Sequence, residues 1–200
     1  MGIKVGLLGL GTVGAGTAAI LLAPQGRHPL LQEIDLHWVG VRSLTKSRPV
    51  ALPPEILTTD LGQIVRDPEV DIVVEVMGGI EPARSLILEA IAHGKHIVTA
   101  NKSLMARHGD EIYTAANHAG VYVMLEAAVA GGIPIIQTLK QTLGVNQIQS
   151  IAGIINGTTN YILTRMRGRR RVCRDSGRCS EIGLCRGRSY GRCRRARCRR

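Results

Sequence analysis

Short apolar runs alternate with longer stretches of helical spacing over the first 125 residues of the chain. The runs fall at residues 3–8, 36–41, 71–76, 95–99 and 121–125. Such runs are typical of parallel strands that are covered on both faces. Between them, residues 13–22, 83–93 and 109–119 carry apolar positions at helical spacing. The alternation predicts an α/β fold built on a doubly wound parallel sheet.

The chain beyond this sheet predicts the opening of a second domain. Residues 133–142 have helical spacing with Pro134 in the first turn, and residues 147–155 have the pattern of a strand. No apolar stretch approaches the length of about twenty residues that a membrane-spanning helix needs. We therefore expect a cytoplasmic protein without a membrane segment.

Composition changes this picture only at the carboxyl-terminal end. The 200 residues are 44% hydrophobic, which is enough for a core, and the formal net charge is +11. Residues 1–166 carry 12 Lys and Arg against 13 Asp and Glu, whereas residues 167–200 carry 14 Arg against Asp175 and Glu181. The five cysteines also lie in this tail, at Cys173, Cys179, Cys185, Cys193 and Cys198. The body of the chain is therefore near neutral and free of cysteine.

A glycine motif, GLGTVG, follows the first predicted strand directly and opens the first predicted helix. Its residues are Gly9, Leu10, Gly11, Thr12, Val13 and Gly14. In dinucleotide-binding folds the first glycine allows a tight turn, the second lets the backbone approach a pyrophosphate, and the third lets helix and strand pack closely. The motif predicts a Rossmann-type site with the phosphates at the helix N-terminus, and a glycine-rich turn without a ligand is the alternative.

Basic residues follow the second predicted strand, where folds that prefer NAD usually place an acidic residue against the ribose 2′-hydroxyl. Arg42 comes directly after that strand, and Lys46 and Arg48 are close behind. Because basic groups suit a 2′-phosphate, the sequence predicts NADP rather than NAD as the cofactor. The alternative is that these are solvated loop charges, which leaves NAD possible.

Two further segments carry polar groups where predicted strands end. Lys102 follows the strand at 95–99, at the edge where α/β folds bind ligands, so it could bind a substrate or carry a proton. Glu126 precedes a turn in the segment EAAVAGGIP, and the carbonyl oxygens of such a turn suit a hard cation. A surface lysine and a simple structural turn are the alternatives.

Five segments, in this order, resemble the homoserine dehydrogenase family. They are GLLGLGTVG, VVEVMGGIEPA, GKHIVTANKSL, LEAAVAGGIPII and GIINGTTNYILTRM, and the match that includes them runs without a gap from about residue 3 to residue 166. The resemblance implies a NAD(P)-binding Rossmann domain at 1–133 and the start of an α+β substrate domain at 134–166. It also implies reversible hydride transfer between NADP(H) and the pair L-homoserine and L-aspartate 4-semialdehyde. That reaction belongs to threonine, methionine and isoleucine synthesis, and family members are commonly homodimers.

The same resemblance implies roles for three sets of residues. The cofactor would lie on Leu10, Gly11, Thr12 and Val13, with Arg42 near the adenosine phosphate and Lys102 near the nicotinamide and the substrate. The residues that match the family's monovalent cation site, usually sodium, are Glu126, Val129, Gly131 and Ile133. The residues that match the stretch facing the substrate are Asn156, Gly157 and Thr158.

The resemblance stops at Arg167. The family continues with an acidic, alanine-rich helix, a GYAEADP-type segment with a substrate-binding Glu, and an Asp and a Lys that handle the proton, and the tail has none of these. Codons permitted for residues 173–192 can be read one base later as AEILADAQKLGYAEADPTA. We therefore interpret residues 167–200 as the product of a frameshift, which the DNA sequence would test. On this interpretation the chain binds NADPH with little or no turnover.

A genuine basic arm is the alternative for the tail. It would make the chain a non-catalytic NADP-binding module that acts as a sensor or contacts nucleic acid or acidic surfaces through salt-sensitive charge contacts. The tail has no CxxC pair and no histidine, which argues against zinc, and Tyr190 is its one aromatic residue, which weakens single-strand recognition by stacking. A third interpretation, another NADP-dependent semialdehyde or imine reductase, is disfavoured by the segments ANKSL and NGTTNYIL. We favour the enzyme family with small-molecule substrates.

Overall fold

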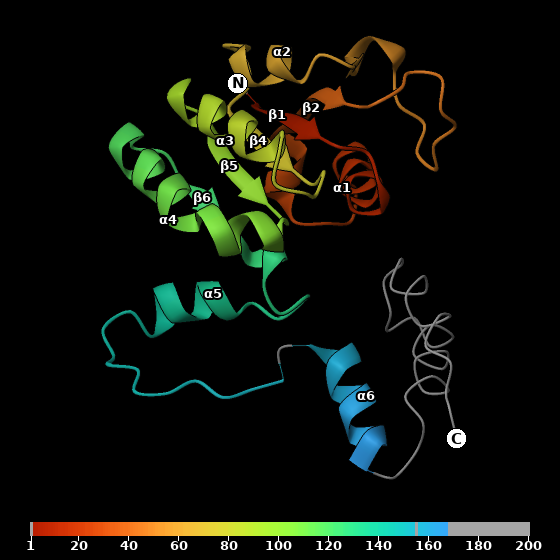
Figure 1. The fold of residues 1–200 in the computed structure, drawn as a ribbon. Coiled ribbons are helices and arrows are strands. Elements are labelled where there is room, and N and C mark those ends of the chain that lie inside the picture. Colours follow the sequence, from red (N-terminus) through yellow and green to blue (C-terminus); the bar gives the residue numbers. More distant parts are fainter. Residues whose placement is uncertain (1, 155, 168–200) are drawn as a thin grey trace. The chain divides into compact units, whose positions relative to one another are not determined.

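The computed structural model describes residues 2–154 and 156–167 (Figure 1). The chain divides into two compact units, Met1–Gly144 and Val145–Arg200. The first unit contains a six-stranded sheet of order β3-β2-β1-β4-β5-β6, in which every paired strand is parallel. The predicted α/β fold is confirmed. Residues 168–200 lie outside the described residues, so the frameshift and basic-arm hypotheses stay predictions.

The central strand of the sheet is β1 (Ile3–Leu8), which pairs with β2 (Ile34–Gly40) on one side and β4 (Ile72–Glu75) on the other. The outer strands are β3 (Leu57–Thr58), β5 (His96–Thr99) and β6 (Val123–Met124). The chain moves outward from β1 through β2 to β3 and then returns to β4 on the opposite side of β1. This reversal of strand order forms the switch point at which open α/β sheets bind their ligands.

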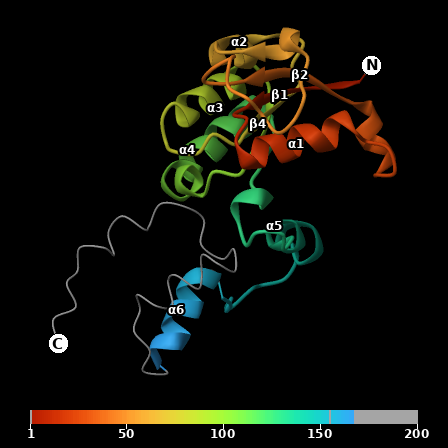
Figure 2. The same cartoon turned by 90° about the vertical axis from the view of Figure 1, so that its right-hand side faces the viewer.

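Helices cover the two faces of the sheet unequally (Figure 2). α1 (Thr12–Leu22) packs on one face, and α2 (Leu61–Arg66), α3 (Ala83–Ala92) and α4 (Lys102–Ala119) pack on the other. Leu7 points into the core on the α1 side and the next residue, Leu8, into the opposite core, because successive side chains of a strand alternate between faces. Both are fully buried. The remaining elements are η1 (Pro29–Glu33), η2 (Pro54–Ile56), η3 (Glu126–Ala128), α5 (Ile135–Gln137), η4 (Thr138–Thr142) and, in the second unit, α6 (Gly157–Arg167).

The face that carries α1 has an apolar groove of about 250 Å³ between this helix and strands β1, β4 and β5. Thr17 and Leu21 line it from α1, Val74 and Val98 line it from the sheet, and Val76 lines it from the residue after β4. These three valines are only half-buried, whereas Val73 on the opposite face is fully buried. The apolar strands β4 and β5 are therefore covered less completely on this face within the first unit.

Two of the predicted helices differ markedly from the structure. The helix expected at 109–119 is α4, which begins at Lys102, because the Asn101 side chain accepts the Leu104 N–H at 3.2 Å and caps the helix there. His108 interrupts the regular helix with a φ of −129°, so the apolar spacing before it differs from the spacing after it. The helix expected at 133–142 is shorter and irregular, formed by α5 and η4.

The strand predicted at residues 147–155 is wrong for residues 147–154, where the structure has no strand. A strand needs a neighbour to pair its backbone N–H and C=O groups. No strand in the described part of the chain pairs with this segment. Ile151 and Ile154 are 70% and 72% exposed as a result.

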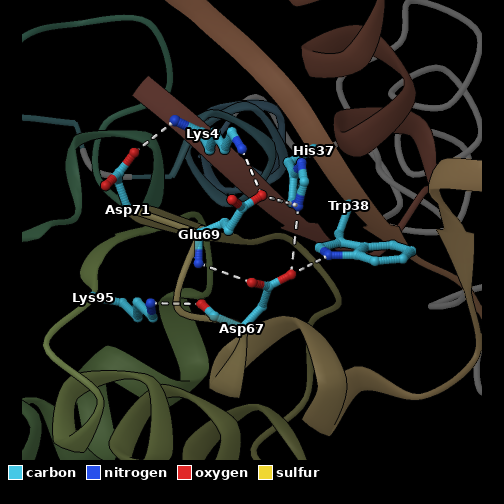
Figure 3. A network of polar contacts seen from close by, with 7 residues as sticks. All are labelled: Lys4, His37, Trp38, Asp67, Glu69, Asp71 and Lys95. Atoms are coloured by element: carbon cyan, nitrogen blue, oxygen red, sulfur yellow. Dashed lines mark hydrogen bonds and ion pairs between the residues drawn. The ribbon is translucent and has the colours of Figure 1, made fainter. Parts of the chain in front are cut away.

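A polar network closes the amino edge of the sheet, away from the switch point (Figure 3). Asp67, which follows α2, accepts the Trp38 indole N–H at 2.6 Å, and its carboxylate lies 3.4 Å from His37 Nε2. Its backbone carbonyl accepts from the buried Lys95 Nζ at 2.6 Å. Glu69 pairs with Lys4 of β1 at 2.6 Å. The network therefore joins the connection between α2 and β4 to β1, β2 and the start of β5.

We expect the Asp67 carboxylate to stabilise the fold at neutral pH and to lose that effect in acid. Burial alone raises the pKa of Asp67, but hydrogen bonds from the Glu69 N–H and the Trp38 indole, together with the nearby His37, outweigh burial and lower the pKa below its ordinary value. A folded-state pKa below the unfolded value means that protonation favours unfolding. Asp67→Asn should cost about 1–3 kcal/mol at pH 7, because it leaves hydrogen-bond donors without a charged acceptor.

The measurement is urea unfolding of both proteins between pH 3 and pH 7. The stability difference should be largest near pH 7 and should shrink as the pH falls below about 4, where the unfolded carboxyl takes up its proton. Glu55→Gln is the matched control, since Glu55 is exposed in η2 and has no polar contact in the described residues. A stability difference that does not depend on pH would contradict the prediction.

Candidate functional site

Backbone hydrogen bonds hold the carboxyl ends of four strands level at the switch point. Gly9 N–H donates to the Gly40 carbonyl at 3.0 Å and so joins the end of β1 to the end of β2. Val76 N–H donates to the Leu8 carbonyl at 3.0 Å, and Ala100 N–H donates to the Glu75 carbonyl at 3.2 Å. The loops that follow β1, β2, β4 and β5 therefore leave the sheet along one edge. Each predicted cofactor residue lies in, or directly after, one of these loops.

The glycine motif has the geometry that a phosphate-binding turn needs. Gly9 has a φ of +104°, a conformation that side chains disfavour. A Cβ at Gly14 would collide with the Gly9 carbonyl oxygen, so only glycine lets α1 start this close to β1. A Cβ at Gly11 would meet no protein atom within 4 Å. Gly11 therefore faces open space beside the turn, where a pyrophosphate could approach the backbone.

The first turn of α1 offers free backbone donors next to this space. Gly11 is the N-cap residue of α1, and no side chain caps the helix. Thr12 and Val13, the first two helical residues, are exposed. Uncapped N–H groups and the positive end of the helix dipole together favour an anion at this position.

The basic residues after β2 separate into two roles. Arg48 donates to the backbone carbonyls of Leu44 and Ser43 and so closes its own loop. Arg42 is exposed directly beyond β2 and makes no hydrogen bond or ion pair within residues 2–154 and 156–167. Of the two arginines, Arg42 is the one whose guanidinium remains free to meet a ligand at the carboxyl edge.

Lys102 is the first residue of α4 and is exposed at the same edge, after β5. No acidic group of the described chain pairs with its ammonium. A cation at this end of a helix faces the positive end of the dipole, which is unfavourable by about 0.3–1 kcal/mol. The position of Lys102 is therefore not explained by stability, and this favours a functional role over that of an ordinary surface lysine.

Three buried polar residues connect the ends of β4 and β5, and of these the sequence indicated the segment of Thr99 and Asn101 but not their roles, and missed Glu75. The Glu75 carboxylate accepts the N–H groups of Met77 and Gly78 at 2.8 and 3.2 Å. It also accepts the Thr99 hydroxyl at 2.7 Å, and Asn101 donates from Nδ2 to the Gly79 carbonyl at 2.6 Å. A signal was present, because Glu75 is the one charged residue in the apolar run IVVEVM.

The segment predicted to bind a cation forms a tight turn in the first unit. Ala130 and Gly131 have positive φ values of 52° and 66°. The Glu126 carboxylate accepts the N–H groups of Ile136 and Gln137 at 3.1 and 2.9 Å, so it caps the start of α5. A carboxylate offers about four lone-pair sites, so these two bonds leave acceptor capacity for a cation. The described residues hold no cluster of three His, Cys, Asp or Glu side chains suited to a metal.

The predicted substrate residues lie in the second unit, at the start of α6. Asn156 caps this helix, since its side chain accepts the Thr159 N–H at 2.8 Å. Gly157 and Thr158 are the first two helical residues. The cofactor residues and Lys102 thus lie at one edge of the first unit, whereas the substrate residues belong to the second unit.

A parallel sheet with this strand order, a glycine turn at its switch point and an uncapped helix above that turn define a dinucleotide-binding protein of the Rossmann class. The family profile described as the homoserine dehydrogenase NAD-binding domain matches residues 9–126, and the homoserine dehydrogenase profile matches residues 134–176. The second match extends beyond Met166, where the motif resemblance stops. The chain belongs to the homoserine dehydrogenase family, whose members are oxidoreductases.

Individual relatives agree with this assignment. A homoserine dehydrogenase from Synechocystis sp. is 71% identical over 166 residues, which are 83% of this chain and 38% of that protein. The Bacillus subtilis homoserine dehydrogenase is 46% identical, with 82% of this chain and 38% of that protein covered. The crystal structure of the Thiobacillus denitrificans enzyme is 45% identical with a TM-score of 0.81, over 94% of this chain and 44% of that one. This chain therefore spans about two fifths of the length of its curated relatives.

Within the described residues, no helix is long and apolar enough to cross a membrane.

Proposed function

We propose that this chain is the cofactor-binding part of an NADP-dependent homoserine dehydrogenase, which interconverts L-homoserine and L-aspartate 4-semialdehyde in threonine, methionine and isoleucine synthesis. The observation that carries this proposal is the shared edge of β1 and β2. There the uncapped start of α1 lies beside the glycine turn, and Arg42 stands free beyond the next strand. A pyrophosphate and a 2′-phosphate are the anions that these two groups suit.

In this proposal Gly9 and Gly14 shape the turn, and the backbone of Leu10, Gly11, Thr12 and Val13 holds the pyrophosphate. The bound nicotinamide supplies hydride transfer. Because the adenosine half lies toward β2, the nicotinamide half lies toward β4 and β5. Lys102 would then hold the substrate oxygen or exchange its proton from the start of α4.

The proposal also includes a substrate site and a cation site. Asn156, Gly157 and Thr158 would bind the substrate, and a sodium ion would sit at the turn formed by Glu126, Val129, Gly131 and Ile133. We assign residues 1–133 to the cofactor domain, 134–166 to the start of the substrate domain, and 167–200 to a tail that lacks the family's proton-handling Lys and Asp. The intact family enzyme would be a homodimer.

We expect NADPH to bind the chain more tightly than NADH, and we expect Arg42→Ala to remove most of this difference. A charge-assisted hydrogen bond contributes about 1.5–3 kcal/mol, so the NADPH dissociation constant should rise about 10- to 100-fold while that of NADH changes little. The measurement is fluorescence titration of the reduced nicotinamide with each protein.

Arg27→Ala is the matched control, because Arg27 is exposed between α1 and β2 at the opposite edge of the sheet. It should leave both dissociation constants unchanged. Equal affinity of the unsubstituted chain for NADH and NADPH would contradict the NADP assignment. Failure to bind either nucleotide would contradict the proposed function as a whole.

A further inference from the structure

The described residues bury four polar or charged side chains, and three of them touch one another or the same loops at the carboxyl edge. Glu75, Thr99 and Asn101 are 0%, 0% and 5% exposed, and the fourth, Lys95, lies at the amino edge. Burying a carboxylate is costly unless its oxygens are hydrogen-bonded. This concentration of buried polar groups at one place is therefore a specific feature of the edge and not a general property of the core.

The three side chains connect two loops that leave neighbouring strands. Glu75 fixes the loop after β4 by accepting the N–H groups of Met77 and Gly78. The Thr99 hydroxyl donates to Glu75 at 2.7 Å and accepts the Asn101 N–H at 3.0 Å. Asn101 donates to the Gly79 carbonyl at 2.6 Å and so completes a circuit of hydrogen bonds between Glu75, Thr99, Asn101 and the loop at 77–79. The loop at 77–79 and the residue that starts α4 are thus tied together by side chains from both strands.

These hydrogen bonds also fix the backbone at Lys102. Asn101 is the residue before Lys102. Its Oδ1 accepts the Leu104 N–H and so caps α4, while its Nδ2 donates to the Gly79 carbonyl in the neighbouring loop. Gly78 and Gly79 have φ values of +75° and +82°, so the loop they form has an unusual path that the circuit maintains. A shift of the circuit would move the loop and the first turn of α4 relative to each other.

We propose that Glu75, Thr99 and Asn101 are positioning residues that hold the loop at 77–79 and Lys102 in register around the nicotinamide half of the cofactor. The proposal rests on the proposed function, because the dinucleotide would have to cross the switch point with its nicotinamide toward β4. None of the three side chains needs to touch the cofactor. They act through the two loops, whose relative position sets the width and shape of that half of the site.

The test compares NADPH with ADP-ribose 2′-phosphate, which lacks the nicotinamide ring. Thr99→Val keeps the shape of the side chain but removes both hydrogen bonds of the hydroxyl. The NADPH dissociation constant should rise about tenfold or more, because the two loops lose the hydroxyl that connects them, while that of ADP-ribose 2′-phosphate stays within about twofold. Thr99→Ser retains the hydroxyl and should restore NADPH affinity. Calorimetric titration measures both ligands on the full 200-residue chain.

Asn101→Asp provides a second variant, in case Thr99→Val does not fold. An aspartate still caps α4 but cannot donate to the Gly79 carbonyl, so it should also weaken NADPH selectively. Equal weakening of the two ligands, or no weakening of either, would overturn the positioning role. If the unsubstituted chain bound neither ligand, the proposed function itself would fail, and this outcome is visible before any variant is made.

Discussion

Gly14→Ala should abolish measurable NADPH binding and destabilise the first unit of the chain. The new Cβ would collide with the Gly9 carbonyl oxygen, so either α1 moves away from β1 or the glycine turn opens. Overpacking of this kind costs about 1–3 kcal/mol of stability. Because the turn and the start of α1 together make the anion site, their displacement should lower NADPH affinity about 100-fold or more. Urea unfolding and NADPH fluorescence titration measure the two effects.

Two other glycines separate the loss of binding from the loss of stability. Gly11→Ala places its Cβ in open space, so stability should fall by only about 0.5–1 kcal/mol, because alanine is a poorer N-cap than glycine. The methyl group should obstruct the approach of a pyrophosphate and weaken NADPH binding. Gly16→Ala also meets no protein atom within 4 Å but lies inside α1. It should leave NADPH affinity unchanged and raise stability by about 0.5–1 kcal/mol, through helix propensity. Unchanged NADPH affinity in Gly11→Ala would show that this open space is not the phosphate site.

The parts of the fold that sequence alone predicted are those fixed by local pattern. The strand at 3–8 and the helix near 13–22 lie where expected, because a buried parallel strand, a glycine turn and an apolar helix each leave a signal within a few residues. The short elements β3 and α2 were not predicted, since two strand residues and six helical residues carry too little periodicity.

The buried circuit at Glu75 shows why the site was predicted only in part. Gly9 and Lys102 can be recognised from the sequence, because each lies in a motif next to the end of a predicted strand. Glu75 and Thr99 are 24 residues apart in the sequence, and their hydrogen bond exists only because β4 and β5 pair in register. A charged residue within an apolar run indicates that a partner exists, but only the fold tells which residue it is.

The strand predicted at 147–155 illustrates the opposite error. Its residues have a strand pattern, yet residues 147–154 have no partner strand in the described chain, and pairing is a property of the whole sheet. A strand pattern alone therefore does not decide whether a segment pairs with a sheet.

We expect the chain as it stands to bind NADPH but to show no homoserine-dependent reduction of NADP. In the proposed function, the residues that would complete the proton transfer belong to the part of the family sequence that residues 167–200 would replace. Joining residues 1–166 to the segment that follows the match in the Synechocystis enzyme should restore turnover. Since positioned acid–base groups contribute about 10²–10⁴-fold, the chimera should be at least about 100-fold faster than this chain. Absorbance of NADPH formed from NADP and L-homoserine measures both rates.

Lys102→Met within that chimera tests the role of the cofactor edge in the same assay. The lysine is exposed and unpaired among the described residues, so its loss should leave stability nearly unchanged while turnover falls about 10²–10⁴-fold. Lys102→Arg keeps the charge but not the titratable ammonium, and partial activity in it would indicate substrate binding as the main role. Turnover by the 200-residue chain at the rate of the chimera would refute the loss of activity assigned to the tail. Full activity of Lys102→Met would exclude Lys102 from the proposed site, because the reaction would then proceed without its ammonium group.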